Sequence, residues 1–372
     1  MIKVDSEKKK KLLVISNSSG GLYGFRKELL SELLKTVSVS AAVPNTGKED
    51  ELRDMGVDII DINVDRRGVN PFKDLTLLIN LKRVIRTKKP DLVITYTIKP
   101  NIYGGIASKL CGVDYAANIT GLGTAFQKKG VLRSFVVWLN RIALKKAKVV
   151  FFENSHNKDV FVNNRIIKEE QSCLLNGAGV NIDHFSVRRY PDDIDEFRFL
   201  FIGRIMKEKG FLELIRAIKR MRNDGVNCSL SVLGGFEEEN LKDVVDECSS
   251  EGWLNYHGIQ ADVRPFIEDA HCFVLPSYHE GMANTNLECA ACGRPVITSN
   301  IPGCKEAVLD GVSGYLCEPQ NEESLYDAMV KMSRLSRDDR EAMGIAGRHH
   351  VERVFDKRIV VKETIDALMR DS

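Results

Sequence analysis

Short apolar runs alternate with amphipathic stretches along the first half of the chain. The apolar runs predict buried strands, and the amphipathic stretches predict helices that cross from one parallel strand to the next. Strands are expected at residues 11–16, 37–43, 58–63, 92–96, 116–119 and 149–153, and helices at 25–34, 75–87, 103–111 and 131–146.

The alternation breaks at the charged segment 188–196 and then restarts, which predicts a linker followed by a second domain of the same kind. Its strands are expected at residues 197–203, 229–233, 254–257, 272–276, 295–299 and 314–317. We therefore predict two doubly wound α/β domains, at 1–184 and 185–355, and a terminal helix at 356–372 that packs back on the first domain. Ligands bind outside the carboxyl ends of parallel strands, so two such domains are expected to face one cleft.

Length and composition agree with this organisation. At 372 residues the chain exceeds what one core usually covers, and 43% apolar with 28% charged residues is typical of a globular protein. No apolar run reaches the ~20 residues of a membrane span, and the first residues lack a signal-peptide core, so a cytoplasmic protein is expected.

The charge is unevenly distributed between the two halves. Residues 1–184 carry 30 Lys and Arg against 19 Asp and Glu, whereas the remaining residues carry 24 against 33. We therefore expect the amino-terminal half to bind an anionic partner.

The nine cysteines are scattered, and the one C-x-x-C pair, Cys289 and Cys292, has no second pair to complete a zinc site, so buried reduced thiols are favoured.

The segment from Glu280 to Glu288 is the strongest candidate for a site. It lies between an apolar strand and an apolar helix, so both carboxylates can face the strand ends. Ionised carboxylates pair well with sugar and ribose hydroxyls, and the helix start offers free N–H groups to a sugar or phosphate. Of the residues between the two carboxylates, Gly281, Met282, Ala283 and Asn284 lead into the helix. The alternative is that Glu288 simply favours the first turn of a helix.

A second candidate segment carries two cations that are also expected at the carboxyl ends of the strands. Gly203 and Arg204 close a strand, and Lys209 and Gly210 open the next helix. Fixed cations can neutralise the charge that develops on a departing nucleoside diphosphate.

Together these segments resemble glycosyltransferase family 4, whose members are retaining enzymes with the GT-B fold. The resemblance covers most of residues 197–320. The residues that carry it are Gly203-Arg204 with Lys209-Gly210, Pro276-Ser277 before Glu280 and Glu288, the segment 292–297 (CGRPVI), and the segment 311–316 (GVSGYL).

The resemblance implies a role for each group. Arg204 and Lys209 would hold the donor diphosphate, Glu280 and residues 281–284 the transferred sugar, and Glu288 the ribose. Arg204, Lys209 and Glu280 are the expected catalytic residues. Lys305 and Glu306 receive no role.

The amino-terminal half resembles the branch of that family that builds capsule, O-antigen and lipid-linked oligosaccharides. The similar segments are 97–104 (TIKPNIYG), 118–126 (NITGLGTAF) and 175–181 (LNGAGVN). We place the acceptor near Lys99, Asn101, Thr120 and Gly121. Many family members have a sugar-binding histidine where Thr120 stands, so that histidine's role has no counterpart here.

Residues 16–24 (SNSSGGLYG) join the first strand to the first helix, and Gly20 and Gly21 permit close approach to a phosphate. A dinucleotide site would need glycine where Ser19 stands and an acidic end to the second strand, which instead ends Val43-Pro44-Asn45. We expect this loop to close over the donor diphosphate.

The helix expected near 131–148 has two faces. Its apolar stripe consists of Leu132, Phe135, Val136, Leu139, Ile142 and Ala143, and its cations are Arg133, Arg141, Lys145 and Lys148. The helix either covers the sheet with a solvated basic face or rests on an anionic membrane, as an enzyme with a lipid-linked acceptor requires.

The expected function is metal-independent transfer of galactose, N-acetylgalactosamine or N-acetylglucosamine from UDP to a saccharide on polyprenyl diphosphate, with retention. Asp193-Ile-Asp195 has the D-x-D form of a metal site but lies in the charged linker, so no metal or other cofactor is expected. Nucleic acid is not an expected partner. The alternatives are a nonhydrolysing UDP-sugar epimerase and a non-catalytic sugar-nucleotide-binding protein.

Overall fold

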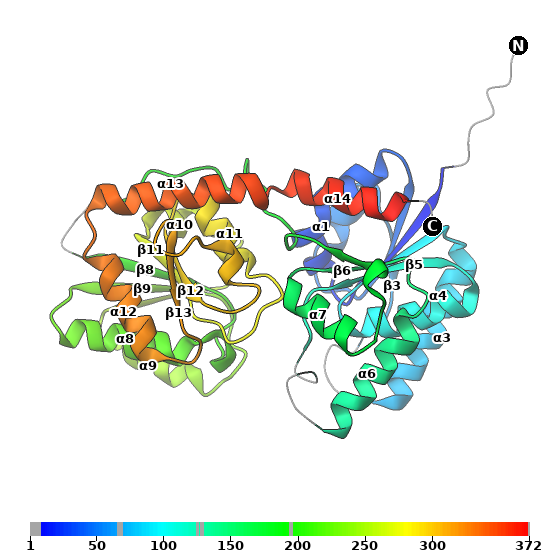
Figure 1. Cartoon of the computed structure of the whole chain (residues 1–372), viewed down its shortest axis with the longest axis horizontal. Helices are drawn as coiled ribbons and strands as arrows, with labels where there is room; N and C mark the ends of the chain where they lie inside the picture. The colour runs from blue at the N-terminus through cyan, green and yellow to red at the C-terminus, as the bar shows by residue number, and fades with distance from the viewer. Residues whose placement is uncertain (1–8, 65–69, 124–125, 127–129, 193–195, 371–372) are drawn as a thin grey trace, which may run out of the picture. The chain divides into compact units, whose positions relative to one another are not determined.

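Figure 1 shows the computed structural model, which describes residues 9–64, 70–123, 126, 130–192 and 196–370. The chain forms two compact units, one of residues 1–178 with 360–372 and one of residues 179–359. The predicted boundaries were 184 and 355, so the structure divides the chain a few residues away from each. Each unit is described separately below.

The first unit is built on seven parallel strands in the order β3-β2-β1-β4-β5-β6-β7. The strands are β1 (Lys11–Ile15), β2 (Ser38–Val43), β3 (Asp58–Asp61), β4 (Leu92–Tyr96), β5 (Asp114–Ile119), β6 (Val149–Phe152) and β7 (Ser172–Leu174). Six of these were predicted, and β7 is added at the edge beyond β6.

Helices cover both faces of this sheet (Figure 1). They are α1 (Ser19–Leu34), α2 (Glu49–Asp54), α3 (Pro71–Lys88), α4 (Gly105–Cys111), α6 (Val131–Leu144), α7 (Ser155–Asn163) and α14 (Lys357–Met369). Leucines of α1 share one apolar core with Val360, Ala367 and Leu368 of α14. The opposite core contains the apolar residues of α3, α4 and α6.

The second unit has six parallel strands in the order β10-β9-β8-β11-β12-β13. They are β8 (Phe197–Ile202), β9 (Cys228–Leu233), β10 (Leu254–Gly258), β11 (Cys272–Leu275), β12 (Val296–Ser299) and β13 (Gly314–Cys317), all close to the predicted ranges. Its helices are α8 (Phe211–Asn223), α9 (Leu241–Ser250), α10 (Arg264–Asp269), α11 (Asn284–Ala291), α12 (Glu322–Ser333) and α13 (Arg337–Val354). One continuous apolar core joins both faces of the sheet to these helices.

Helix α1 begins at Ser19, whereas the sequence predicted a loop through Gly24 and a helix from Phe25. That prediction was wrong because Ser18 caps the helix, its hydroxyl accepting a hydrogen bond from the Gly21 N–H at 3.0 Å. Gly20 and Gly21 therefore lie inside the first helical turn. In the part of the chain that the structure describes, no helix is both long and apolar enough to cross a bilayer.

Candidate active site

The loops after β8 and β11 pack directly against each other at the carboxyl ends of these neighbouring strands. Gly210 has φ +68°, and a Cβ there would lie 2.1 Å from the Pro276 carbonyl oxygen. The Tyr278 N–H also donates to the Glu208 carbonyl at 2.9 Å. Only glycine fits this contact, which fixes the residue before it, Lys209, against the second loop.

Lys209 and Glu280 form an ion pair in this contact, and both side chains are largely buried. The Ser277 hydroxyl donates to the same carboxylate oxygen at 2.8 Å. A cation and a carboxylate that are 71 positions apart in sequence are thus held in one place. A largely buried pair with a further hydrogen bond is costly to break, because either partner alone would be left charged and unpaired.

The segment from Glu280 to Ala283 is also held from the other side, by the loop after β12. The Ala283 N–H donates to the Gly303 carbonyl at 2.7 Å, and the Gly303 N–H donates to Glu306 at 2.7 Å. Sequence reasoning gave Glu306 no role and did not consider Gly303. The structure shows that both support the predicted sugar-binding segment.

Helix α11 starts at Asn284, and no side chain caps it at Ala283. Met282 and Ala283 are buried, and Asn284 Oδ1 is buried with no hydrogen-bond partner among the described residues. The uncapped helix start offers N–H groups and a positive dipole end, and the Asn284 oxygen can accept from a hydroxyl. This combination suits a hydroxyl-rich or anionic ligand.

Glu288 lies on the second turn of α11, since the helix starts four residues earlier and has no acidic residue in its first turn. A helix-start preference therefore does not explain this residue. Burial raises its pKa to about 7, although the positive charge of Lys357 opposes the shift. A carboxyl group with this pKa is close to half ionised at neutral pH.

The raised pKa predicts a pH-dependent effect of Glu288→Gln. Because the folded-state pKa lies above the unfolded value, ionisation destabilises the wild-type fold progressively as pH rises from about 4.5 to about 7, and the effect levels off above that. The variant should therefore be more stable than wild type at pH 8, by roughly 3 kcal/mol, and should lose this advantage near pH 4.5. Denaturant unfolding at the two pH values measures it. Equal stability at pH 8 would contradict the shift.

Arg204 follows β8 and is the most accessible of the predicted donor-binding side chains. It is 59% exposed, and its guanidinium lies 3.4 Å from the Glu237 carboxylate. The preceding Gly203 donates its N–H to Leu233 at 2.9 Å, which continues the pairing of β8 with β9 beyond the strand ends. Arg204 thus lies at the carboxyl end of β8, as predicted. Its contact with the donor stays a prediction.

The start of α1 in the first unit is already hydrogen-bonded by side chains of the same unit. The Thr46 hydroxyl accepts from the N–H groups of Ser19 at 3.0 Å and Gly20 at 3.5 Å. Burial opposes ionisation of nearby Glu49, but hydrogen bonds from Ser19 and Thr46 hold its pKa below the usual value. Donor binding by Gly20 and Gly21 stays a prediction.

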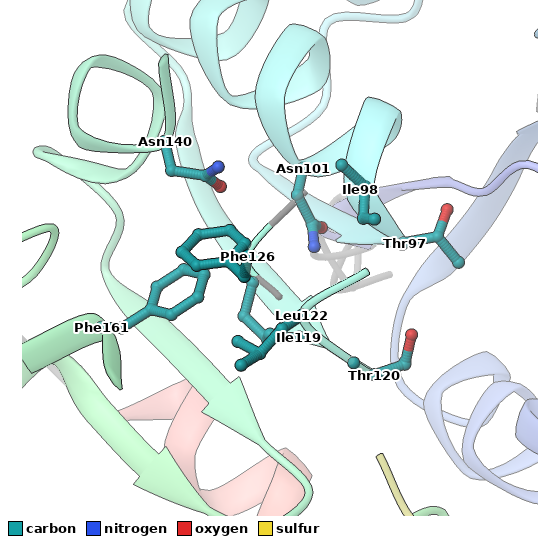
Figure 2. Close-up of a pocket in the computed structure, with 10 residues that line it drawn as sticks. Thr97, Ile98, Asn101, Ile119, Thr120, Leu122, Phe126, Asn140 and Phe161 are labelled. Atoms are coloured by element: carbon teal, nitrogen blue, oxygen red, sulfur yellow. The ribbon is translucent and has the colours of Figure 1, made fainter. Parts of the chain in front are cut away.

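Three of the four predicted acceptor-side residues line one pocket in the first unit (Figure 2). They are Asn101, Thr120 and Gly121. The fourth, Lys99, does not line it; its ammonium lies 2.7 Å from the Asp74 carboxylate. A π-helical turn at Pro100–Gly104, which follows Thr97 at φ +75°, brings Asn101 to the pocket. Such turns are common at functional sites.

Helix α6 does not bury the predicted apolar stripe as a whole. Phe135 is 44% exposed and Trp138 is 51% exposed, and their rings stack with centroids 6.0 Å apart. The buried face instead contains Asn140, Ala143 and Leu144. The exposure of Phe135 disagrees with the interpretation in which the whole apolar stripe covers the sheet. The Leu132 side chain lies outside the described residues.

Among the predicted basic residues of this helix, Arg141 and Lys145 are exposed, and Arg133 and Lys148 are partly exposed. The Arg141 guanidinium donates to the carbonyls of Arg165 and Asn164 at 3.0 and 2.7 Å.

All nine cysteines are free, and Cys289 and Cys292 are buried thiols, as expected. Asp193 and Asp195 lie outside the described residues. Within those residues, no three His, Cys, Asp or Glu side chains are grouped as metal ligands would be.

Two protein-family models match the chain, one in each unit. Residues 196–334 match the family described as glycosyl transferases group 1, and residues 11–154 match the family described as glycosyl transferase 4-like. The first match contains the Lys209–Glu280 pair and Glu288. The second contains the pocket residues from Thr97 to Asn140.

Curated relatives match over most of their length. An N,N'-diacetylbacillosaminyl-diphospho-undecaprenol alpha-1,3-N-acetylgalactosaminyltransferase of Campylobacter jejuni is 26% identical, covering 89% of this chain and 91% of the relative. A UDP-Gal:alpha-D-GlcNAc-diphosphoundecaprenol alpha-1,3-galactosyltransferase of Escherichia coli is 26% identical, covering 72% of each. The solved structure of HepE from Anabaena with UDP-glucose has a TM-score of 0.80 at 17% identity, covering 96% of this chain and 99% of HepE.

Proposed function

We propose that this chain, which belongs to the group 1 and 4-like glycosyltransferases and has the GT-B fold, transfers a sugar from a UDP-sugar to a saccharide on polyprenyl diphosphate. The observation that carries the proposal is the ion pair of Lys209 with Glu280 beside the uncapped start of α11. The names of the two relatives support a diphospho-undecaprenol-linked acceptor. In this role the enzyme would act in bacterial surface polysaccharide synthesis.

The donor site follows from what each group of the second unit can bind. Lys209 and Arg204 would neutralise the diphosphate, because fixed cations stabilise the charge that grows on this leaving group. Glu280, Asn284 and the backbone of residues 281–283 would hold the sugar hydroxyls, and Glu288 the ribose. The transferred sugar is proposed to be galactose, N-acetylgalactosamine or N-acetylglucosamine.

We propose retention without a metal ion. Glu280 is bound by Lys209 and Ser277, so it is placed to orient the sugar rather than to act as a free nucleophile. The acceptor hydroxyl would attack the anomeric carbon from the side on which the UDP leaves, and a diphosphate oxygen would take its proton. Orientation and charge stabilisation would then lower the barrier.

A lipid-linked acceptor requires that the enzyme reach a membrane surface, and α6 supports this. Its exposed pair, Phe135 and Trp138, stands on the same helix as exposed Arg141 and Lys145. Aromatic rings favour the membrane interface and basic side chains attract anionic headgroups. We propose that α6 rests on the inner face of the cell membrane.

The double variant Phe135→Ser/Trp138→Ser should bind anionic vesicles at least ~10-fold more weakly than wild type, because two large apolar side chains no longer enter the interface. Co-sedimentation with phosphatidylglycerol-phosphatidylcholine vesicles at low salt measures this. The matched control is Phe25→Ser on α1, which has similar exposure, 45%, but lies on a helix over the opposite face of the sheet. Equal loss in both variants, or no wild-type binding, would refute the membrane contact.

The activity itself is tested by UDP release from a panel of UDP-sugars, with EDTA present and with or without detergent-solubilised polyprenyl-diphosphate saccharides. We expect release from one donor only when acceptor is present. Epimerisation of the donor without acceptor would favour the epimerase alternative, and donor binding without release would favour a non-catalytic protein. Activity that EDTA abolishes and magnesium or manganese restores would refute metal independence.

A further inference from the structure

Helix α13 places a buried histidine against the loop that follows β12. His350 is 9% exposed, and its Nε2 lies 2.8 Å from the backbone carbonyl oxygen of Glu306. Because a carbonyl oxygen can only accept, Nε2 must carry a hydrogen and donate it. The other ring nitrogen, Nδ1, is buried and has no hydrogen-bond partner among the described residues. The imidazole therefore directs its hydrogen bond at the short turn η4 (Lys305–Ala307), which contains Glu306.

Two further hydrogen bonds lead from Glu306 to the predicted sugar-binding segment, residues 280–283. The Glu306 carboxylate accepts from the Gly303 N–H at 2.7 Å, and the Gly303 carbonyl accepts from the Ala283 N–H at 2.7 Å. The loop also touches the segment closely, since a Cβ on Gly303 would lie 2.5 Å from the Gly281 carbonyl oxygen. A shift of η4 would therefore move this segment, because the two backbones are already in contact.

Helix α13 is a rigid base for this contact, because it packs against both α11 and η4. One turn before the histidine, a Cβ on Gly347 would lie 3.6 Å from the Cβ of Ala290 on α11, so the two helices approach closely. The imidazole ring packs edge-on against the Phe355 ring, with centroids 5.5 Å apart. A side chain that packing holds on a helix fixes its hydrogen-bond partner more precisely than a side chain on a loop.

We propose that His350 is a positioning residue for the sugar of the donor. Its hydrogen bond holds η4, and Glu306 and Gly303 pass this constraint to residues 280–283, which would contact the sugar. The histidine itself would not touch the substrate. This inference rests on the proposed function and adds a residue of α13 to the recognition of the transferred sugar.

The sugar and the nucleotide should respond differently to loss of the imidazole. Without it, the Glu306 carbonyl loses this donor, and η4 would move to recover a hydrogen bond. The segment that holds the sugar would then be displaced, and misplacement of a reacting group by about 1 Å can cost ~100-fold in rate. UDP carries no sugar, so its affinity would depend on groups outside the segment, such as Arg204 and Glu288, and would change little.

The test compares variants with the UDP-sugar that supports transfer and with UDP as an inhibitor. In His350→Ala we expect kcat/KM for the UDP-sugar to fall roughly 10–100-fold, while the inhibition constant of UDP stays near the wild-type value. His350→Gln should restore most of the activity, because its amide nitrogen can take the place of Nε2. His350→Asn should not restore it, because its shorter amide reaches only the place of Nδ1. The matched control is His349→Ala, which changes an exposed residue of the same helix and should behave like wild type.

Hydrogen–deuterium exchange gives a readout that needs no substrate. Residues 280–287 should exchange faster in His350→Ala and His350→Asn than in wild type or His350→Gln, because the Ala283 N–H is less protected. Unchanged exchange, or a parallel loss of UDP and UDP-sugar affinity, would overturn the proposal. If wild type transfers no sugar, the proposed function fails, and faster exchange in His350→Ala would still show that the histidine holds the segment.

Discussion

Lys209→Ala is expected to lower kcat by about 100-fold or more, since it removes a fixed cation from the proposed diphosphate site. The substitution also leaves the Glu280 carboxylate with only the Ser277 hydroxyl of its two partners described above. Both the leaving group and the residue that orients the sugar would be affected. Initial rates of UDP release at saturating donor and acceptor measure the loss.

The matched control is Lys219→Ala, which removes a cation from α8 that pairs with Glu247 at 2.6 Å, away from the loops of the site. It should change turnover little. Arg204→Ala should lower turnover by a similar factor of about 100, while leaving the Lys209–Glu280 pair intact. A Lys209→Ala variant that works at near wild-type rates would remove this residue from the mechanism.

Gly303→Ala is expected to lower turnover by about 100-fold through displacement of the sugar-binding segment. A Cβ at this position would lie 2.5 Å from the Gly281 carbonyl oxygen and 2.8 Å from that of Glu280. Backbone atoms cannot yield as a flexible side chain can, so residues 280–283 would have to shift. A displacement near 1 Å in a group that positions substrate can cost ~100-fold in rate.

Gly311→Ala separates this clash from general backbone strain. Gly311 has φ +72°, similar to the +87° of Gly303, but a Cβ there would meet nothing within 4 Å. Both variants should lose some stability because alanine disfavours positive φ. Kinetic loss confined to Gly303→Ala would establish displacement of the segment. Equal losses of kcat in both variants would contradict it.

The architecture was predictable from the sequence because parallel strands buried on both faces appear as apolar runs. All six predicted strands of the second unit were found within about one residue of their expected ends, and the β8 and β11 ends place Lys209 and Glu280 as anticipated. The missed elements of the first unit are β7, α2 and α7, which are short and consist mostly of polar or only partly buried residues. Apolar periodicity carries little information about such elements.

The tertiary support of the site was less predictable. The Gly303 carbonyl accepts a hydrogen bond from Ala283, 20 residues earlier, and the Glu306 carboxylate accepts one from the Gly303 N–H. No spacing in the sequence indicates these contacts. On α6, Asn140 is buried and Phe135 is exposed, which reverses the usual preference of both residue types, so apolarity alone did not identify the buried face. Departures from local sequence preferences are common at functional sites.

The position of α14 bears on how the protein is made. The core beneath α1 includes Val360, Ala367 and Leu368, so the first unit is completed by a segment that is synthesised after the second unit. The second unit is one continuous stretch, residues 179–359, and has all its core residues before α14 is fully synthesised. During translation one apolar face of the amino-terminal sheet therefore stays partly exposed until α14 has been synthesised. Exposed apolar surface of this kind can be bound by chaperones.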